Sequence, residues 1–142
     1  MAGVSSLDVL ASQISPTPYL ICPILDARKG EVYTAFYRYD ETNLPKRLSA
    51  YQAMRPQDLV KNIKEKIIFV GDGIKTYGDY LGKSLSSLAL FPNPSLHLPH
   101  GSAVARLGSE LLRKGESLDV KTFTPIYVRL SEAEIKWQEK QQ

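Results

Sequence analysis

Two strand-like runs joined by a short glycine-ended loop lie in the first third of the chain. The first run, residues 19–25, is largely apolar, and the second, residues 31–39, is rich in aromatic and β-branched residues, as strands are. Alternation along the second run predicts one face with Val32, Thr34, Phe36 and Arg38 and an opposite face with Tyr33, Ala35, Tyr37 and Tyr39. The loop between them, residues 26–30, ends in Gly30, which supplies the positive φ that a tight turn needs. These runs predict a β-hairpin, and a weaker run at 47–53 extends it to a three-stranded antiparallel meander.

Beyond residue 55 the hydrophobic pattern changes from alternation to helical spacing. Helices are predicted at 4–14, with Ser5 in a capping box, at 56–66, at 75–85, at 102–114, with Ser102 as N-cap and Gly115 as terminator, and at 131–140. Short apolar runs at 67–70 and 88–91 predict buried strands between these helices.

The order of these elements predicts a fold class. A meander followed by alternating helices and strands indicates an α/β protein with a mixed β-sheet of about five strands and helical cover. This is the element order of the ribonuclease-H-like half of an actin-like (ASKHA) fold. The length of 142 residues fits a single domain, residues 1–142.

Composition excludes several classes of protein. The apolar share of 43% and the charged share of 23% are near globular averages, which excludes a disordered, collagen-like or coiled-coil chain. No unbroken apolar run exceeds four residues, against the ~20 that span a bilayer, so no membrane partner is expected. The single cysteine excludes an internal disulfide framework, and no secretory signal is evident, which together predict a cytoplasmic protein.

The segment Gly71-Asp72-Gly73 is a candidate nucleotide site. It follows a predicted strand and precedes a predicted helix, and ligands of α/β proteins gather at the carboxyl ends of strands. Backbone N–H groups there would hold a phosphate, and Asp72 would bind a ribose hydroxyl or a metal ion. The alternative, which we favour, is a tight turn in which glycines permit unusual φ and Asp72 caps the helix.

No catalytic residue and no metal site is predicted. His97 and His100 are the two histidines, and Pro99 between them opposes a helix that would direct both to one metal ion. We therefore interpret them as loop residues. Cys22 lies in an apolar strand and is expected to be a buried, unreactive thiol.

Three carboxylates, Asp26, Glu31 and Asp72, fall at the ends of predicted strands. Acid–base catalysis would need two of them to converge with perturbed pKa values, and the sequence alone does not show that they do.

Tyrosines on the second strand of the hairpin allow two interpretations. Tyr33, Tyr37 and Tyr39 would stack nucleic-acid bases if they were exposed beside the basic residues Arg28, Lys29 and Arg38. A sheet that buries them explains the same residues, and we favour it. The net charge of +3 permits contact with RNA but gives it little support.

Three short segments are distinctive. Residues 3–7 read Gly-Val-Ser-Ser-Leu, residues 26–33 read Asp-Ala-Arg-Lys-Gly-Glu-Val-Tyr, and residues 125–129 read Pro-Ile-Tyr-Val-Arg. In this order, with Gly-Asp-Gly between the last two, they resemble the TsaB (YeaZ) family. These are accessory proteins of bacterial tRNA threonylcarbamoyladenosine synthesis that often carry a glycoprotease-like label. The motif residues are Asp26, Arg28, Gly30, Glu31, Tyr33, Pro125, Tyr127 and Arg129.

The resemblance implies a non-catalytic scaffold or activator. Such a protein acts with TsaD-like and TsaE-like partners in modifying the adenosine next to the anticodon of tRNA, with ATP or ADP in the full complex. A homodimer is compatible with it, as is tRNA contact through Arg28 and Lys29. The alternative function is a glycoprotease-like peptidase or an actin-like ATPase with its site around Asp72.

The resemblance covers only part of the family's pattern. Members normally begin with a strand resembling Ile-Asp-Thr-Ser and a glycine-rich segment, and neither occurs here. We therefore expect residues 1–142 to correspond to the C-terminal part of a TsaB-like protein whose N-terminal half is absent. The family pairs with its TsaD-like partner through that N-terminal half.

Overall fold

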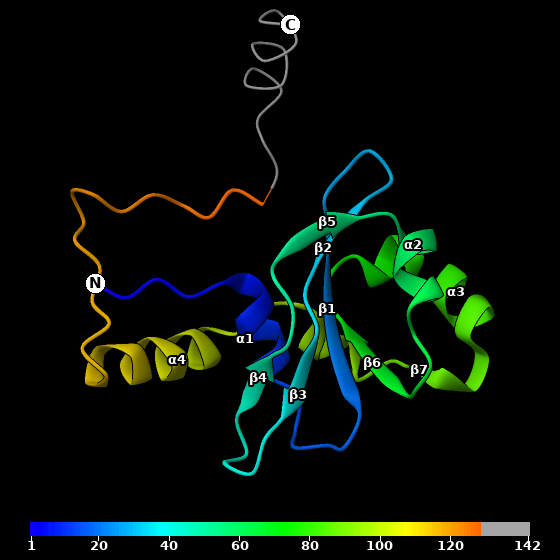
Figure 1. The fold of residues 1–142 in the computed structure, drawn as a ribbon, viewed down its shortest axis with the longest axis horizontal. Coiled ribbons are helices and arrows are strands. Elements are labelled where there is room, and N and C mark those ends of the chain that lie inside the picture. Colours follow the sequence, from blue (N-terminus) through cyan, green and yellow to red (C-terminus); the bar gives the residue numbers. More distant parts are fainter. Residues whose placement is uncertain (129–142) are drawn as a thin grey trace, which may run out of the picture.

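The computed structural model describes residues 1–128, in which a β-sheet lies between two layers of helices (Figure 1). The strands are β1 (Leu20–Asp26), β2 (Val32–Thr34), β3 (Tyr37–Tyr39), β4 (Pro45–Arg47), β5 (Gln52–Met54), β6 (Ile67–Val70) and β7 (Ala89–Leu90). The helices are α1 (Ser6–Ser12), α2 (Pro56–Lys61), α3 (Ile74–Leu85) and α4 (Gly101–Arg113), with 3₁₀ turns η1 (Ser86–Leu88) and η2 (Pro94–His97). None of the described helices is long and apolar enough to cross a membrane.

The predicted meander is confirmed, but its second and third strands are broken. β2 and β3 both pair antiparallel with β1 in one continuous register, Thr34 opposite Ile24 and Tyr37 opposite Ile21. They are therefore one strand interrupted for two residues. β2 pairs with β5, and β3 pairs with β4. Residues 48–51, which connect β4 to β5, form a bulge between these two strands. The Ser49 hydroxyl fills the break by accepting a hydrogen bond from the backbone N–H of Phe36 at 3.0 Å.

On its other side β1 pairs with parallel strands. Cys22 lies opposite Phe69 of β6, and Ile67 of β6 lies opposite Ala89 of β7, also in parallel. The sheet is thus mixed, as predicted. Its seven strands form the five predicted rows, because two of those rows consist of two short strands each.

The two faces of the sheet bury separate cores. One core lies under α2 and α3 and includes Cys22, Ile24, Val32, Leu59, Ile67, Phe69 and Leu81. The other lies under α1 and includes Leu7, Leu10, Ala11, Ile21, Ala35, Tyr37 and Val70. The alternation predicted along residues 31–39 is confirmed, since Val32 and Phe36 pack on the first core and Ala35 and Tyr37 on the second.

The helix ends confirm most of the predicted signals. Ser5 is the N-cap of α1 and accepts a hydrogen bond from the backbone N–H of Leu7. Gly115 ends α4 with φ of 79°, and its N–H donates to the carbonyl of Leu112. The prediction of Ser102 as N-cap is wrong, because α4 begins one residue earlier and its N-cap is His100. The helix predicted at 131–140 lies outside the described residues.

The apolar stripe predicted on α4 is only partly covered. α4 packs against α1, and Ala103 is buried. Val104 and Leu112 remain 40% and 51% exposed. The chain then runs without regular structure from residue 116 to residue 128 along the same side of the molecule (Figure 1).

Candidate functional site

The carboxyl ends of β1 and β6 bring two sequence motifs together. The Gly71-Asp72-Gly73 turn follows β6, and its Gly73 N–H donates to the carbonyl of Ile24 in β1 at 3.1 Å. One carboxylate oxygen of Asp72 accepts the backbone N–H of Asp26, also at 3.1 Å. The turn after β6 is therefore hydrogen-bonded to the end of β1, where the hairpin loop begins.

The glycines of this turn allow a close approach of two backbones. Gly71 has φ of +119°, and a Cβ built on it would lie 2.2 Å from the carbonyl oxygen of Ile24. Gly71 N–H points to His97 Nδ1 at 3.5 Å. These observations support the tight-turn interpretation, because the N–H groups of Gly71 and Gly73 are already engaged. Asp72 does not cap α3 as predicted, since α3 has Gly73 as N-cap and no side-chain cap.

The hairpin loop at 26–30 has an unusual backbone. Gly30 has φ of 78°, which confirms the predicted role of this glycine. Arg28 and Lys29 also have positive φ, 63° and 53°, which nothing in the sequence signalled because neither residue favours that region. Asp26 Oδ1 accepts the backbone N–H of Arg28 at 2.8 Å and so holds the loop at its start.

The histidines and the cysteine occupy structural positions. His97 lies in η2, and burial lowers its pKa. The His100 ring lies 2.8 Å from the carbonyl of Ser95 on an exposed loop. Cys22 is fully buried, its pKa is raised by burial to about 12, and its Sγ lies 3.1 Å from Thr34 Oγ1. Within residues 1–128 no group of three His, Cys, Asp or Glu residues is placed to hold a metal ion.

The three tyrosines of the second strand are buried unequally: Tyr37 and Tyr39 pack in the core under α1, as we favoured, whereas Tyr33 is only half-buried. Tyr37 is 1% exposed, and its hydroxyl donates to Asp8 Oδ1 at 2.5 Å. Tyr51 donates to the other oxygen of Asp8 at 2.7 Å. Burial, followed by the Asp8 hydrogen bond, raises the pKa of both tyrosines. The sequence reasoning missed this network, because Asp8 and Tyr51 are far apart in the chain.

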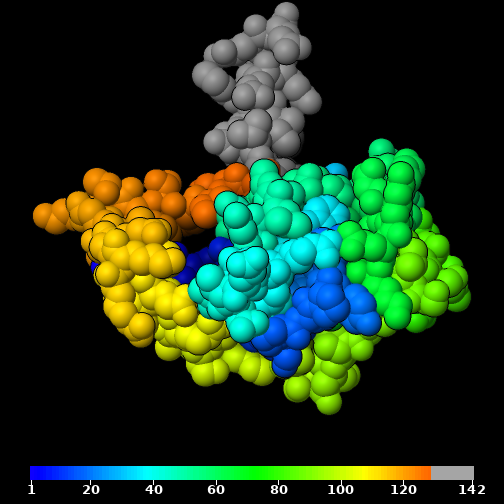
Figure 2. Space-filling view, turned by 60° about the horizontal axis from the view of Figure 1, so that its bottom comes forward, coloured from blue at the N-terminus to red at the C-terminus, as the bar shows by residue number. Residues whose placement is uncertain are grey.

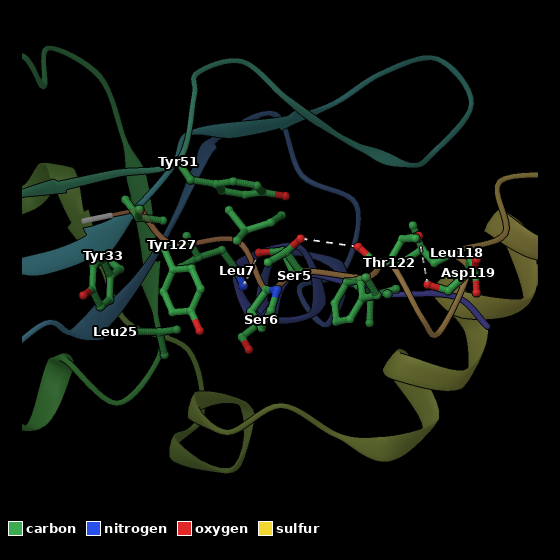
Figure 3. Close-up of a pocket in the computed structure, with 17 residues that line it drawn as sticks. Ser5, Ser6, Leu7, Leu25, Tyr33, Tyr51, Leu118, Asp119, Thr122 and Tyr127 are labelled. Carbon is green, nitrogen blue, oxygen red and sulfur yellow. Dashed lines mark hydrogen bonds between the residues drawn. The ribbon is translucent and has the colours of Figure 1, made fainter. Parts of the chain in front are cut away.

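A groove of about 690 Å³ is lined by residues from each of the three distinctive segments. It is lined by residues 3–7, by Leu25 and Tyr33 of the hairpin, by Tyr51, and by residues 122–128. In Figure 3 the rings of Tyr33 and Tyr127 lie near each other beside Leu25. Figure 2 shows a hollow between the orange C-terminal segment and the cyan strands, with the dark blue N-terminal segment inside it.

Only some of the motif residues of the TsaB (YeaZ) resemblance line this groove. Tyr33, Pro125 and Tyr127 line it, whereas Asp26, Arg28 and Gly30 lie in the hairpin loop, and Glu31 lines a neighbouring pocket with Lys29 and Val128. Arg129 lies outside the described residues.

Comparisons with known proteins show the family and the fold of the chain. The family model described as "TsaD: tRNA N6-adenosine threonylcarbamoyltransferase" matches residues 1–137. The chain belongs to this family. Within it the chain is TsaB-like, since it is 34% identical, over 99% of its length, to the tRNA threonylcarbamoyladenosine biosynthesis protein TsaB of Bacillus subtilis. The chain spans 61% of the length of that TsaB.

Solved structures show the same fold. A Pseudomonas aeruginosa protein with similarity to peptidase YEAZ matches with a TM-score of 0.70 and 21% identity, covering 89% of this chain and 57% of that chain. YeaZ from Pseudomonas aeruginosa matches with a TM-score of 0.67 and 20% identity, covering 87% and 58%. The predicted resemblance to the TsaB (YeaZ) family and the predicted fold class are both confirmed.

Proposed function

We propose that this chain acts in the cytoplasm as a non-catalytic scaffold and activator of tRNA threonylcarbamoyladenosine synthesis. It would work with TsaD-like and TsaE-like proteins, and ATP or ADP would be bound in the full complex. The observation that carries the proposal is the 34% identity to TsaB over 99% of the chain.

The site geometry supports a binding role over catalysis. The candidate acid–base side chains are hydrogen-bonded to the protein's own backbone. Asp26 and Asp72 accept hydrogen bonds from backbone N–H groups, and His97 accepts one from the N–H of Gly71. The three distinctive segments meet instead at an open groove lined mainly by apolar and tyrosine side chains. Such a surface suits contact with another molecule.

We also propose that residues 1–142 form one domain corresponding to the C-terminal part of a TsaB-like protein. The chain spans 61% of the length of the Bacillus subtilis TsaB, which supports a correspondence with part of such a protein. The choice of the C-terminal part rests on the order of the three distinctive segments alone. On this proposal, stable binding to a TsaD-like protein requires the N-terminal part as well.

Reconstitution tests both statements. The chain alone, and the chain fused behind the N-terminal part of the Bacillus subtilis TsaB, are each mixed with a TsaD-like and a TsaE-like protein, and tRNA threonylcarbamoylation and copurification are measured. We expect the fusion to copurify with the TsaD-like protein and to restore modification. Absence of association in every nucleotide condition contradicts the proposal. ATP turnover by the chain alone, abolished by Asp72→Ala, establishes the ATPase alternative instead.

A further inference from the structure

The segment that follows α4 exposes large apolar side chains to an unusual extent. Every residue from 112 to 127 is exposed. Ile126 and Tyr127 are 67% and 76% exposed, and Val120 and Phe123 are exposed as well. Isolated apolar residues are common on protein surfaces, but apolar residues gathered beside a groove indicate a surface that contacts another molecule.

Contacts within the chain hold this segment at one end only. Leu118 and Met1 exchange two backbone hydrogen bonds, of 2.7 and 3.4 Å. A Cβ built on Gly3 would lie 2.8 Å from the Leu118 side chain and 3.3 Å from that of Phe123, so both side chains pack on the N-terminal segment. Within the described residues, no backbone hydrogen bond joins residues 124–128 to another part of the chain. These last residues therefore line the groove without being covered from outside.

The chemistry of the groove favours an apolar partner. Among the described residues that line it, Asp119 alone carries a charge, and its carboxylate already accepts the backbone N–H of Lys121 at 2.9 Å. The other lining side chains are apolar, aromatic or hydroxyl-bearing, and Tyr33 and Tyr127 lie beside Leu25 (Figure 3). A charged ligand would find no opposite charge here, whereas an apolar protein surface would bury these side chains from water.

The shape of the surface disfavours a second copy of this chain as the partner. In a two-fold dimer the same patch faces itself, so the patch must be complementary to its own shape. The hollow seen in Figure 2 would face a second hollow and would remain unfilled.

The comparisons supply a different partner. More than a third of the Bacillus subtilis TsaB has no counterpart in this chain. Met1 is hydrogen-bonded to Leu118, which lines the groove, so a polypeptide joined to Met1 would begin at this surface. We propose that the N-terminal part of a TsaB-like protein packs its apolar side chains into the groove and over residues 118–127. The inference rests on the proposed correspondence of this chain with the C-terminal part of such a protein.

Hydroxyl-radical footprinting with mass spectrometry tests this packing, because it reports the solvent exposure of individual side chains. The chain alone is compared with the chain fused behind the N-terminal part of the Bacillus subtilis TsaB. We expect the oxidation rates of Phe123 and Tyr127 to fall about fivefold or more in the fusion, because the core of an interface excludes water. Tyr80 is exposed on α3, at the far end of the molecule from α4, and should react equally in both proteins (Figure 1).

Tyr127→Ser and Tyr80→Ser are matched variants, since each removes one exposed tyrosine ring. Tyr127→Ser should lower the melting temperature of the fusion by about 4 °C and change that of the chain alone by less than about 1 °C. Tyr80→Ser should change the two proteins equally. The chain alone gives a further measurement that does not depend on the fusion. It should sediment as a monomer and bind the apolar dye anilinonaphthalene sulfonate, and Tyr127→Ser should weaken dye binding severalfold.

The inference is overturned by unchanged oxidation of Phe123 and Tyr127 in the fusion, or by equal effects of Tyr127→Ser on the fusion and the chain alone. A chain that sediments as a dimer, and becomes monomeric with Tyr127→Ser, assigns the surface to a second copy instead. Binding of a TsaD-like protein to the chain alone, abolished by Tyr127→Ser, assigns it to that protein.

The same fusion separates this inference from the proposed function. If tRNA modification is not restored although Phe123 and Tyr127 are protected, the proposed function is wrong and the packing stands. If modification is restored without that protection, the function stands and the packing is wrong.

Discussion

Substitution of Gly71 by alanine should be among the most damaging single changes in this chain. The new Cβ would lie 2.2 Å from the carbonyl oxygen of Ile24, whereas carbon and oxygen normally approach to about 3.3 Å. The turn and β1 must therefore separate by about 1 Å. That movement disrupts the hydrogen bonds from Gly73 to Ile24 and from Asp26 to Asp72, both 3.1 Å long.

The expected loss follows from these contacts. The neutral backbone hydrogen bond contributes about 1 kcal/mol and the one to the carboxylate about 2 kcal/mol. The positive φ of +119° adds strain of about 1–2 kcal/mol for any residue with a Cβ. We expect Gly71→Ala to lower the free energy of unfolding by about 4 kcal/mol, a large part of the 5–15 kcal/mol typical of a domain.

The matched control is Gly30→Ala, which shares a positive φ but meets nothing within 4 Å. It should cost about 1 kcal/mol, from backbone strain alone. Urea unfolding followed by circular dichroism measures both variants. Equal losses for Gly71→Ala and Gly30→Ala would show that the close approach to Ile24 contributes nothing, and would refute the reasoning.

Three further predictions concern two hydrogen-bonded side chains and the buried thiol. Asp8→Ala leaves two tyrosine hydroxyls without their acceptor and should cost about 3 kcal/mol in thermal or urea unfolding; an unchanged midpoint contradicts the network. The pKa of Cys22 is raised by burial from 9.0 to about 12, so the free energy of unfolding should fall as pH rises above 9, by up to about 1.4 kcal/mol per pH unit. Cys22→Ala should remove that part of the pH dependence, and parallel curves for the two proteins would disprove it. Gln13 makes three hydrogen bonds to the loop at 96–100, one of them accepting the His100 N–H at 2.6 Å. Gln13→Leu should therefore speed hydrogen exchange at His100 at least tenfold, and unchanged protection would show that the loop is held by other contacts.

Sequence reasoning was accurate where one local pattern sets the structure. The alternation along residues 31–39 placed Val32 and Tyr37 on opposite faces, and the structure buries them in opposite cores. Pro56 and Gly115 mark a helix start and a helix end where predicted. These features depend on residues within a few positions of one another, so the sequence carries the whole signal.

The same reasoning was wrong where a second segment decides the local geometry. The strands predicted as continuous at 31–39 and 47–53 are both broken, because a bulge at 48–51 inserts the Ser49 hydroxyl between the paired backbones. Asp72 binds the backbone of Asp26 in the neighbouring strand instead of capping its own helix. Neither partner is recognisable from the residues adjacent to it.

The order and type of the elements, and with them the mixed sheet, were determined by the sequence alone, since periodicity and turn residues act over short distances. The tertiary structure alone decided how the three distinctive segments meet in one groove and how Arg28 and Lys29 are displayed in a left-handed turn. Both depend on contacts between residues tens of positions apart, such as that of Asp26 with Asp72. Only the packed chain brings such residues within hydrogen-bonding distance.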